Sequence, residues 1–272
     1  SQGANATAVG YLAGNSEQAI NTVAVGLQAA QTSQGTHAIA VGYLAGNSEQ
    51  SEHAIAVGRE AGQTSQGKYA TGVGVQAGET LQGSHATAVG TAAGRTSQAD
   101  YAIAVGFSAG LTEQKIHATA IGVLAGETKQ GCSSVAVGRE AGQTSQGINS
   151  VGVGYVAGQT VQGAGGVAVG YYAGKTSQGG QSVAIGFQAA QSNQGANSVA
   201  IGTLAGLTSQ GANSVAIGVN AARSNQKAEA TAMGNAAGYT GQAANGTAIG
   251  SVAGHSNQGA QATAVGREAA KH

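Results

Sequence analysis

The sequence predicts an all-β protein, a parallel β-solenoid of seventeen coils with 16 residues each, and three observations support this prediction. Glycine recurs every sixteen residues from Gly10 to Gly266 without an insertion. A sixteen-residue unit is too short for helical repeats, which need about 33 residues or more. The 272 residues include 48 glycines and no proline, and proline would remove a ladder hydrogen bond from a stacked sheet. We therefore expect residues 1–272 to form a single solenoid domain.

Each coil can be numbered by positions 1 to 16, starting at Ser1. Positions 6 to 9 predict the main strand, because β-branched residues stand at alternate positions, as in Ser198-Val199-Ala200-Ile201. Glycines at positions 3, 10 and 14 are expected to form the turns. We expect positions 7 and 9 to point into the coil. Seventeen coils stacked at about 4.8 Å would form a rod of roughly 80 Å.

Position 2 is glutamine in every coil, and position 16 is threonine or serine in every coil except the last. Position 1 varies freely between them, so we expect positions 2 and 16 to point inward. Stacked amides can bond one another along an axis, and an unpaired buried amide costs about 1–3 kcal/mol. The column predicts a core amide ladder of Gln2, Gln18, Gln34, Gln50, Gln66, Gln82, Gln98, Gln114, Gln130, Gln146, Gln162, Gln178, Gln194, Gln210, Gln226, Gln242 and Gln258.

Position 8 is alanine in fifteen coils and glycine at Gly72 and Gly152. A column facing solvent should vary, so a small residue over the whole length favours close packing against another chain. The alternative is that a small residue lets a tight coil bend. Oligomerisation often stabilises a core this thin. The predicted oligomer interface contains Ala8, Ala24, Ala40, Ala56, Ala104, Ala120, Ala136, Ala168, Ala184, Ala200 and Ala216.

Composition and charge exclude several classes of protein. Eleven basic and eleven acidic residues cancel, so no net field would attract nucleic acid or an anionic membrane. No apolar run approaches the roughly 20 residues that span a bilayer. The single cysteine, Cys132, rules out an internal disulfide framework. The chain starts at Ser1 without a signal-like segment, so we expect a processed form or an excerpt.

The sequence predicts neither an enzyme nor a cofactor site, because a uniform solenoid places like residues in columns. Asp100 is the only aspartate, which excludes calcium-binding repeats that need aspartate in every unit. Hexapeptide acyltransferase solenoids are excluded because sixteen is not a multiple of six. The glycine pairs around Val73 and Val153 lack the spacing and the following helix of a nucleotide loop.

Two surface columns carry the remaining chemistry. His37, His53, His85 and His117 share position 5, where the alternatives are metal binding by neighbouring coils or an ordinary outward polar column. Positions 11 and 12 form the outer corner, where aromatic residues on three successive coils predict an exposed patch. Its candidate surface-binding residues are Tyr155, Tyr171, Tyr172 and Phe187. Isolated surface aromatics are also common, so both interpretations of this patch stay open.

The run from Asn197 to Gly202, with the sequence NSVAIG, is repeated from Asn213 to Gly218, and looser versions cover the chain. It resembles the head repeats of YadA-like trimeric autotransporter adhesins and similar repeats in phage and viral fibre proteins. The resemblance implies a left-handed parallel β-roll that trimerises through a sheet face and binds host matrix or other surfaces. The coils are longer than is usual in that family, the glutamine column is not typical of it, and no heptad pattern indicates a stalk.

We therefore expect a non-enzymatic, extracellular structural or adhesive protein, exposed on a cell or a virion. Its expected partners are copies of itself and a surface or matrix ligand, with no nucleic acid and no membrane span. One alternative is a filament, sheath or tube subunit that stacks end to end, because both ends stop in an ordinary repeat and bare sheet edges favour stacking. A minor alternative, suggested by the hydroxyl column at position 16, is ice binding.

Overall fold

The computed structural model describes residues 2–271 and confirms an all-β parallel β-solenoid, with no helix among those residues. The chain forms two compact units, Ser1–Ser133 and Ser134–His272, which we call the N-terminal unit and the C-terminal unit. Both units are built from the same sixteen-residue coil. The expectation that residues 1–272 form a single domain stays a prediction.

Each coil contributes one strand at positions 7 to 9 to a parallel main ladder. In the N-terminal unit these strands are β1 (Thr7–Val9), β3 (Val23–Val25), β5 (Ile39–Val41), β7 (Ile55–Val57), β9 (Thr71–Val73), β11 (Thr87–Val89), β13 (Ile103–Val105) and β15 (Thr119–Ile121). In the C-terminal unit they are β17 (Val135–Val137), β19 (Val151–Val153), β21 (Val167–Val169), β23 (Val183–Ile185), β25 (Val199–Ile201), β27 (Val215–Ile217), β29 (Thr231–Met233), β30 (Thr247–Ile249) and β31 (Thr263–Val265).

A second parallel ladder uses position 16 of one coil and positions 1 and 2 of the next. In the N-terminal unit its strands are β2 (Ser16–Gln18), β4 (Thr32–Gln34), β6 (Ser48–Gln50), β8 (Thr64–Gln66), β10 (Thr80–Gln82), β12 (Thr96–Gln98), β14 (Thr112–Gln114) and β16 (Thr128–Gln130). In the C-terminal unit they are β18 (Thr144–Gln146), β20 (Thr160–Gln162), β22 (Thr176–Gln178), β24 (Ser192–Gln194), β26 (Thr208–Gln210) and β28 (Ser224–Gln226).

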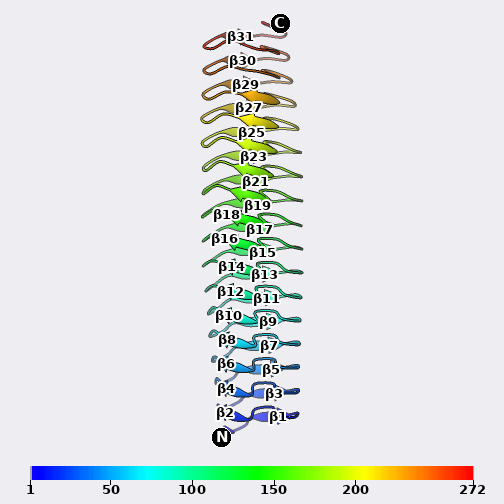
Figure 1. Ribbon diagram of the computed structural model, residues 1–272, viewed down its shortest axis with the longest axis vertical. Coiled ribbons are helices and arrows are strands. Elements are labelled where there is room, and N and C mark those ends of the chain that lie inside the picture. Colours follow the sequence, from blue (N-terminus) through cyan, green and yellow to red (C-terminus); the bar gives the residue numbers. More distant parts are fainter. Residues whose placement is uncertain (1, 272) are drawn as a thin grey trace. The chain divides into compact units, whose positions relative to one another are not determined.

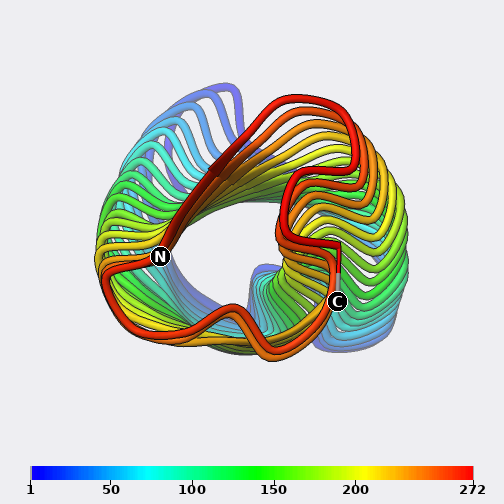
Figure 2. The same cartoon turned by 90° about the horizontal axis from the view of Figure 1, so that it is seen from above.

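Within each unit every strand pairs with the equivalent residues one coil away, so the register offset is sixteen residues, as in Ala88 against Ala104. In the second ladder only the outer residues pair, as in Thr64 with Thr80 and Gln66 with Gln82. The residue between them is left-handed, with φ of 54° at Ser65. Figure 1 shows the strands of each unit in succession, and Figure 2 shows their coils from above.

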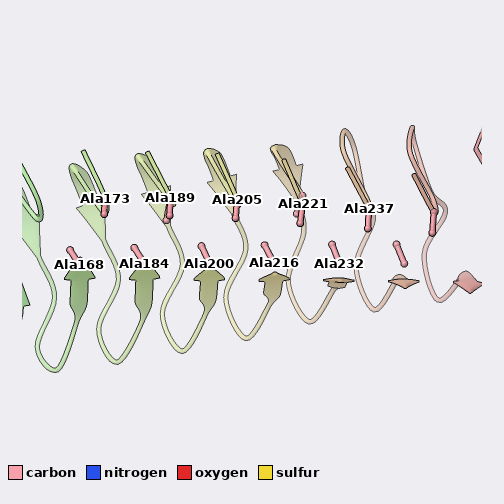
Figure 3. Close-up of a cluster of buried hydrophobic side chains, with 14 of the residues drawn as sticks. Ala168, Ala173, Ala184, Ala189, Ala200, Ala205, Ala216, Ala221, Ala232 and Ala237 are labelled. Carbon is pink, nitrogen blue, oxygen red and sulfur yellow. The ribbon is translucent and has the colours of Figure 1, made fainter. Parts of the chain in front are cut away.

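The narrow core of each coil is made of alanine. Position 8 alanines point toward the position 13 alanines on the opposite side of the coil, as Figure 3 shows for Ala168 with Ala173 and Ala184 with Ala189. These four side chains are fully buried and belong to one hydrophobic cluster of the C-terminal unit. The main strands therefore turn position 8 inward and positions 7 and 9 outward. The expectation that positions 7 and 9 point into the coil is wrong.

The predicted interface at position 8 is wrong for the same reason. In the isolated chain the exposed fraction is 0% for Ala24, Ala40, Ala56, Ala104, Ala120, Ala136, Ala168, Ala184, Ala200 and Ala216. Ala8, in the first coil, is exposed but pairs in the same register with Ala24. A Cβ atom built on Gly72 would lie 2.8 Å from the Ala77 carbonyl oxygen. The opposite backbone is so close that the small residue fills the interior, and the bulkier β-branched neighbours lie outside.

The glycine at position 10 is required by the contact between coils. Gly106 has a φ of 131°, and a Cβ atom there would lie 2.5 Å from the carbonyl oxygen of Gly122 in the next coil. Because that oxygen belongs to the backbone, it cannot move aside without disturbing the stack. The invariant spacing seen in the sequence therefore marks the closest backbone approach between coils.

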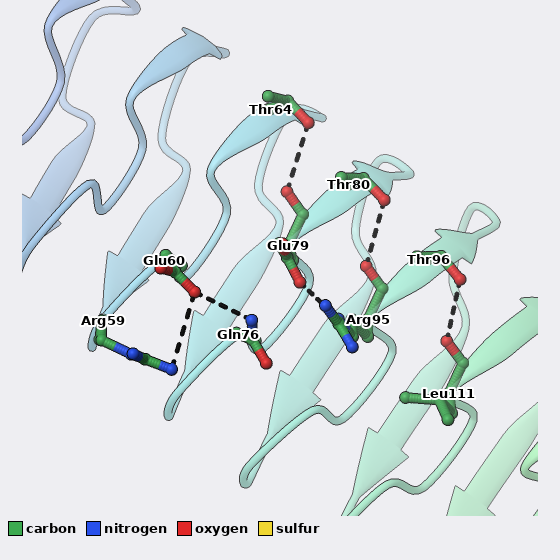
Figure 4. A network of polar contacts seen from close by, with 9 residues as sticks. All are labelled: Arg59, Glu60, Thr64, Gln76, Glu79, Thr80, Arg95, Thr96 and Leu111. Carbon is green, nitrogen blue, oxygen red and sulfur yellow. Dashed lines mark hydrogen bonds and ion pairs between the residues drawn. The ribbon is translucent and has the colours of Figure 1, made fainter.

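The hydroxyl side chains at position 16 bond along the axis. In Figure 4, Thr64, Thr80 and Thr96 each donate a hydrogen bond to the position 15 carbonyl of the next coil, over 3.4, 3.4 and 3.2 Å. These three side chains are half-buried. The prediction of an inward column at position 16 is therefore only partly correct.

Candidate interaction surfaces

The predicted amide ladder is present inside the solenoid. In the N-terminal unit each glutamine from Gln18 to Gln114 donates a hydrogen bond from Nε2 to the Oε1 atom of the next one, over 2.9–3.2 Å. The same Nε2 also donates to a main-strand carbonyl of the preceding coil, as from Gln98 to Thr87 over 2.9 Å. The buried amides thus hold each coil to both of its neighbours.

The ladder has interruptions that the sequence does not reveal. Gln2 is exposed, and its Nε2 donates to the Ala6 carbonyl at 3.1 Å, so Gln18 Oε1 accepts no hydrogen bond. In the C-terminal unit Gln146, Gln178, Gln194 and Gln226 also keep a buried Oε1 without a partner. The continuous ladder is therefore confirmed between Gln18 and Gln130 and is wrong for parts of the C-terminal unit.

The outer side of the main ladder is an exposed apolar surface, which we call the apolar outer face. It consists of the position 7 and position 9 side chains, which are valine, isoleucine or threonine except for Met233. In the N-terminal unit Ile103 and Ile121 are 38% and 40% exposed. In the C-terminal unit Ile185 and Ile201 are 38% and 37% exposed. The residues expected to form the core therefore form a regular exposed surface.

The predicted aromatic patch of Tyr155, Tyr171, Tyr172 and Phe187 is brought together in the C-terminal unit. Tyr155 and Tyr171 stack with ring centroids 5.1 Å apart, and Tyr171 and Phe187 stack at 5.2 Å. Tyr172 meets Tyr171 edge-on at 4.3 Å. The guanidinium of Arg139 lies 5.5 Å from the Tyr155 ring centroid. Stacking uses the ring faces, so the patch presents ring edges and hydroxyl groups outward. Its role in binding stays a prediction.

Neighbouring phenols and a cation set the electrostatics of this patch. A hydrogen bond with Tyr171 and partial desolvation raise the pKa of Tyr172 to about 12. The Lys175 ammonium nitrogen lies 4.6 Å from the Tyr172 ring centroid, in cation–π geometry. The patch is therefore held together by polar contacts as well as by ring stacking.

A second aromatic feature, which the sequence did not single out as a stack, runs along position 5 of the N-terminal unit. Six exposed rings follow one another with centroids 4.8–5.1 Å apart, and we call them the ring column. Its members are His37, His53, Tyr69, His85, Tyr101 and His117. The signal available in the sequence was the sixteen-residue spacing of tyrosine and histidine at one position.

Backbone conformation explains why histidine and asparagine are frequent at position 5. The residue is left-handed in coil after coil, with φ of 58° at His53 and 55° at Asn197. Asparagine and histidine are among the non-glycine residues most often found in this region. His37 also shares a 3.0 Å hydrogen bond with the Asn21 side chain. The column is thus selected by the turn and joined by contacts between side chains.

Within residues 2–271, histidine, cysteine and acidic side chains form no group of three or more that could hold a metal ion. His37 and His53 instead stack face to face, with centroids 4.8 Å apart. Cys132 is a half-buried free thiol. The part of the chain that the structure describes also contains no helix long and apolar enough to cross a membrane.

Comparison with known proteins does not identify a function, so functional inference depends on the fold and the surfaces. No protein-family model matches the sequence, and no curated protein is significantly similar to it.

Proposed function

We propose that this protein is a non-enzymatic structural element of an extracellular fibre or adhesin head, which assembles with copies of itself through the apolar outer face. The single observation that carries the proposal is the uncovered outer side of the main ladder. All-parallel sheets are almost always covered on both sides. In each coil the inner side is covered by alanine and glutamine, whereas the outer side exposes two columns of β-branched residues.

The size of this face supports assembly. The N-terminal unit places eight main-ladder strands in one parallel stack and the C-terminal unit nine. At about 4.8 Å per strand and a width of about 10 Å, each unit offers roughly 400 Å². A partner contributes about 800 Å² to a standard interface, so the face of a single unit supplies about half of that area. An exposed apolar patch of this extent is typical of an interaction site.

The chemistry of the face favours a second copy of the chain as the partner. A copy offers the same columns, spaced by the same interval along the axis of each unit, so side chains of two copies can interdigitate along a unit. No charged residue stands at position 7 or 9 in any coil, so two such faces approach without repulsion or loss of ion hydration. The likeness to trimeric adhesin heads and viral fibres supports an assembled protein on a cell or virion surface.

The assembly face can be tested with the full-length chain. Ile185 and Ile201 are adjacent on the face, and the double variant I185K/I201K places two ammonium groups there. The matched control is S177K/N193K, which adds the same charges on two adjacent coils at position 1, where Lys129 occurs naturally. Multi-angle light scattering should give an oligomer for the original protein and the control, and a smaller mass for I185K/I201K at unchanged circular dichroism.

A monomeric original protein, or an unchanged mass for I185K/I201K, would remove the proposed interface. Negative-stain microscopy separates the two assembly modes. Particles as long as one chain would support side-by-side assembly, and fibres that lengthen with concentration would support the filament alternative instead.

A further inference from the structure

The aromatic patch of the C-terminal unit places two tyrosines of successive coils face to face. Tyr155 and Tyr171 both stand at position 11, two residues after the main strands β19 and β21. Their rings stack with centroids 5.1 Å apart and planes inclined by only 11°. Phe187 stacks on Tyr171 in the following coil, and the Arg139 guanidinium lies over Tyr155 from the preceding one. Equivalent atoms of the two phenol rings therefore lie about one coil spacing apart.

This pairing distinguishes the patch from the rest of the sequence. Of the eight tyrosines in the chain, Tyr155 and Tyr171 are the only two that share a position in successive coils. In the ring column, for example, the His85 ring separates the two tyrosine rings and stacks on both. Five tyrosines thus have no tyrosine at the same position of a neighbouring coil, and they are Tyr11, Tyr43, Tyr69, Tyr101 and Tyr239.

Tyr172 adjoins this pair in a different orientation. Its ring is inclined by 65° to the Tyr171 ring and by 66° to the Tyr155 ring. An edge-on ring directs its edge at the face of its neighbour, whereas two parallel rings hold their equivalent edges side by side. The ring carbons beside the two hydroxyl groups, the ortho carbons, are therefore matched between Tyr155 and Tyr171 and are not matched in either pair with Tyr172.

The paired tyrosines are accessible and can move. Tyr171 is 43% exposed and Tyr155 is half-buried. Because stacking covers the ring faces, the outward edges carry the hydroxyl groups and the ortho carbons. Exposed side chains change rotamer within picoseconds to nanoseconds, so the two edges can close the remaining gap. Two groups held together on one scaffold also react far faster than the same groups free in solution.

We propose that Tyr155 and Tyr171 are a site of oxidative cross-linking, where a haem peroxidase with hydrogen peroxide joins them as dityrosine. Each phenol gives up one electron and its hydroxyl proton and becomes a phenoxyl radical. The two unpaired electrons form a carbon–carbon bond between the ortho carbons, and the two ring protons released there return to the two oxygens. Hydrogen peroxide takes up the two electrons and two protons and becomes two water molecules. The product is a covalent bond between two neighbouring coils.

Treatment of the dilute full-length chain with a haem peroxidase and hydrogen peroxide tests this proposal. Trypsin releases residues 140–175 as one peptide, which holds all three tyrosines of the patch and no internal lysine or arginine. This peptide should lose two hydrogen atoms, show dityrosine fluorescence and give no separate fragments for backbone breaks between Tyr155 and Tyr171. An unchanged peptide mass, or a link found only between two copies of the peptide, would overturn the proposal.

Variants assign the link to one pair of rings. Y155F and Y171F each remove one phenol but keep the ring, as Phe187 does at the same position, and both should abolish the looped peptide. The matched control Y172F should keep it. A link that persists in Y155F or Y171F, or that disappears in Y172F, would count against the assignment.

Hydrogen exchange tests what the bond does to the fold. A cross-link restricts the open states of the segment that it closes, so exchange in β19 and β21 should slow by about tenfold after oxidation. Oxidised Y171F should exchange as it did before treatment. Unchanged exchange in the linked original protein would contradict a role in holding the two coils together. None of these outcomes depends on assembly through the apolar outer face, because the looped peptide forms within one chain.

Discussion

The N-terminal and C-terminal units share one coil design but differ in their buried amides. From Gln18 to Gln114 every glutamine donates to the next, whereas the C-terminal unit lacks the bonds that would reach Gln146, Gln178, Gln194 and Gln226. Position 6 also differs between the units. It is alanine from Ala38 to Ala118 and is serine in several coils of the C-terminal unit. Each missing bond of the C-terminal unit involves a coil with serine at position 6, but the bond from Gln194 to Gln210 forms between two such coils.

The turn between positions 3 and 6 also differs between alanine and serine coils. With alanine, the position 6 N–H donates to the position 3 carbonyl, as from Ala102 to Ala99 over 3.3 Å. With serine, the hydroxyl takes that carbonyl, as from Ser198 to Gly195 over 2.6 Å. Side-chain donors compete with backbone donors in this way. The adjacent glutamine reaches the position 6 carbonyl at 3.4 Å in both kinds of coil, for Gln194 with Ser198 and for Gln82 with Ala86. We expect the serine hydroxyl to weaken the amide bonds beside it.

Replacing one buried glutamine of the amide ladder in each unit should change the unfolding free energy more than any other substitution considered. Gln98→Leu removes bonds to Thr87, Ala102 and Gln114, leaves Gln114 Oε1 without its donor and removes one acceptor of the Gln82 amide. We expect it to lower the unfolding free energy by about 3–5 kcal/mol, because each unpaired buried group costs about 1–3 kcal/mol.

Gln194→Leu serves as the comparison, since Gln194 Oε1 accepts no bond to begin with. Gln194→Leu should lower the unfolding free energy by about 1 kcal/mol less than Gln98→Leu does. Urea unfolding followed by hydrogen exchange in each unit measures both, because repeat proteins can unfold in parts. If the two variants lost the same unfolding free energy, the missing hydrogen bond to Gln194 would not affect stability.

Substitutions that restore the missing amide bonds should raise the stability of the C-terminal unit by a smaller amount. S182A/S198A/S214A removes the competing hydroxyls, so the backbone turn and the amide bonds can form as in the N-terminal unit. We expect the C-terminal unit to gain about 1 kcal/mol, measured by slower hydrogen exchange of its main strands. The reverse change, A86S/A102S, should weaken the N-terminal unit. A less stable S182A/S198A/S214A variant, or a more stable A86S/A102S variant, would contradict the role assigned to position 6.

The aromatic patch of the C-terminal unit gives the smallest predicted effect, at alkaline pH. The pKa of Tyr172 is raised to about 12, first by its hydrogen bond with Tyr171. A raised pKa of an acid means that the neutral form is favoured in the folded state, so this contribution is present below pH 10 and is lost as pH rises through about 12. Phenolate absorbance should show one late-ionising tyrosine, and Y171F should return Tyr172 toward its ordinary range.

The repeat period, the strand positions and the glutamine column could be predicted from the sequence because each depends on a pattern in one dimension. The orientation of the main strand could not. Alternation places Val199 and Ile201 on one side and Ala200 on the other, and it does not say which side is inside. The usual preference for burying bulky residues suggested the wrong side, because the backbone opposite leaves room only for alanine.

The surfaces were predictable to different degrees. The aromatic patch follows from neighbouring residues at positions 11 and 12, so its four members could be named in advance. The ring column was harder to predict, because it forms only if the outward side chains at position 5 stack along the axis at the same spacing as the strands. The interruptions in the C-terminal unit could not be predicted, because a hydroxyl residue at position 6 also stands beside bonds that form, as Thr22 does beside the bond from Gln18 to Gln34.

The constant register offset of sixteen residues has a consequence for how such a chain can change in length. Each coil within a unit contacts the preceding and following coils through equivalent residues, as Thr87 does with Ile103. Deleting or duplicating one whole coil returns every backbone group to an equivalent partner, while a gain or loss of any other number of residues mismatches all later strands. A gene for this fold can therefore gain or lose whole coils, each encoded by 48 nucleotides, without changing the pairing of the remaining strands.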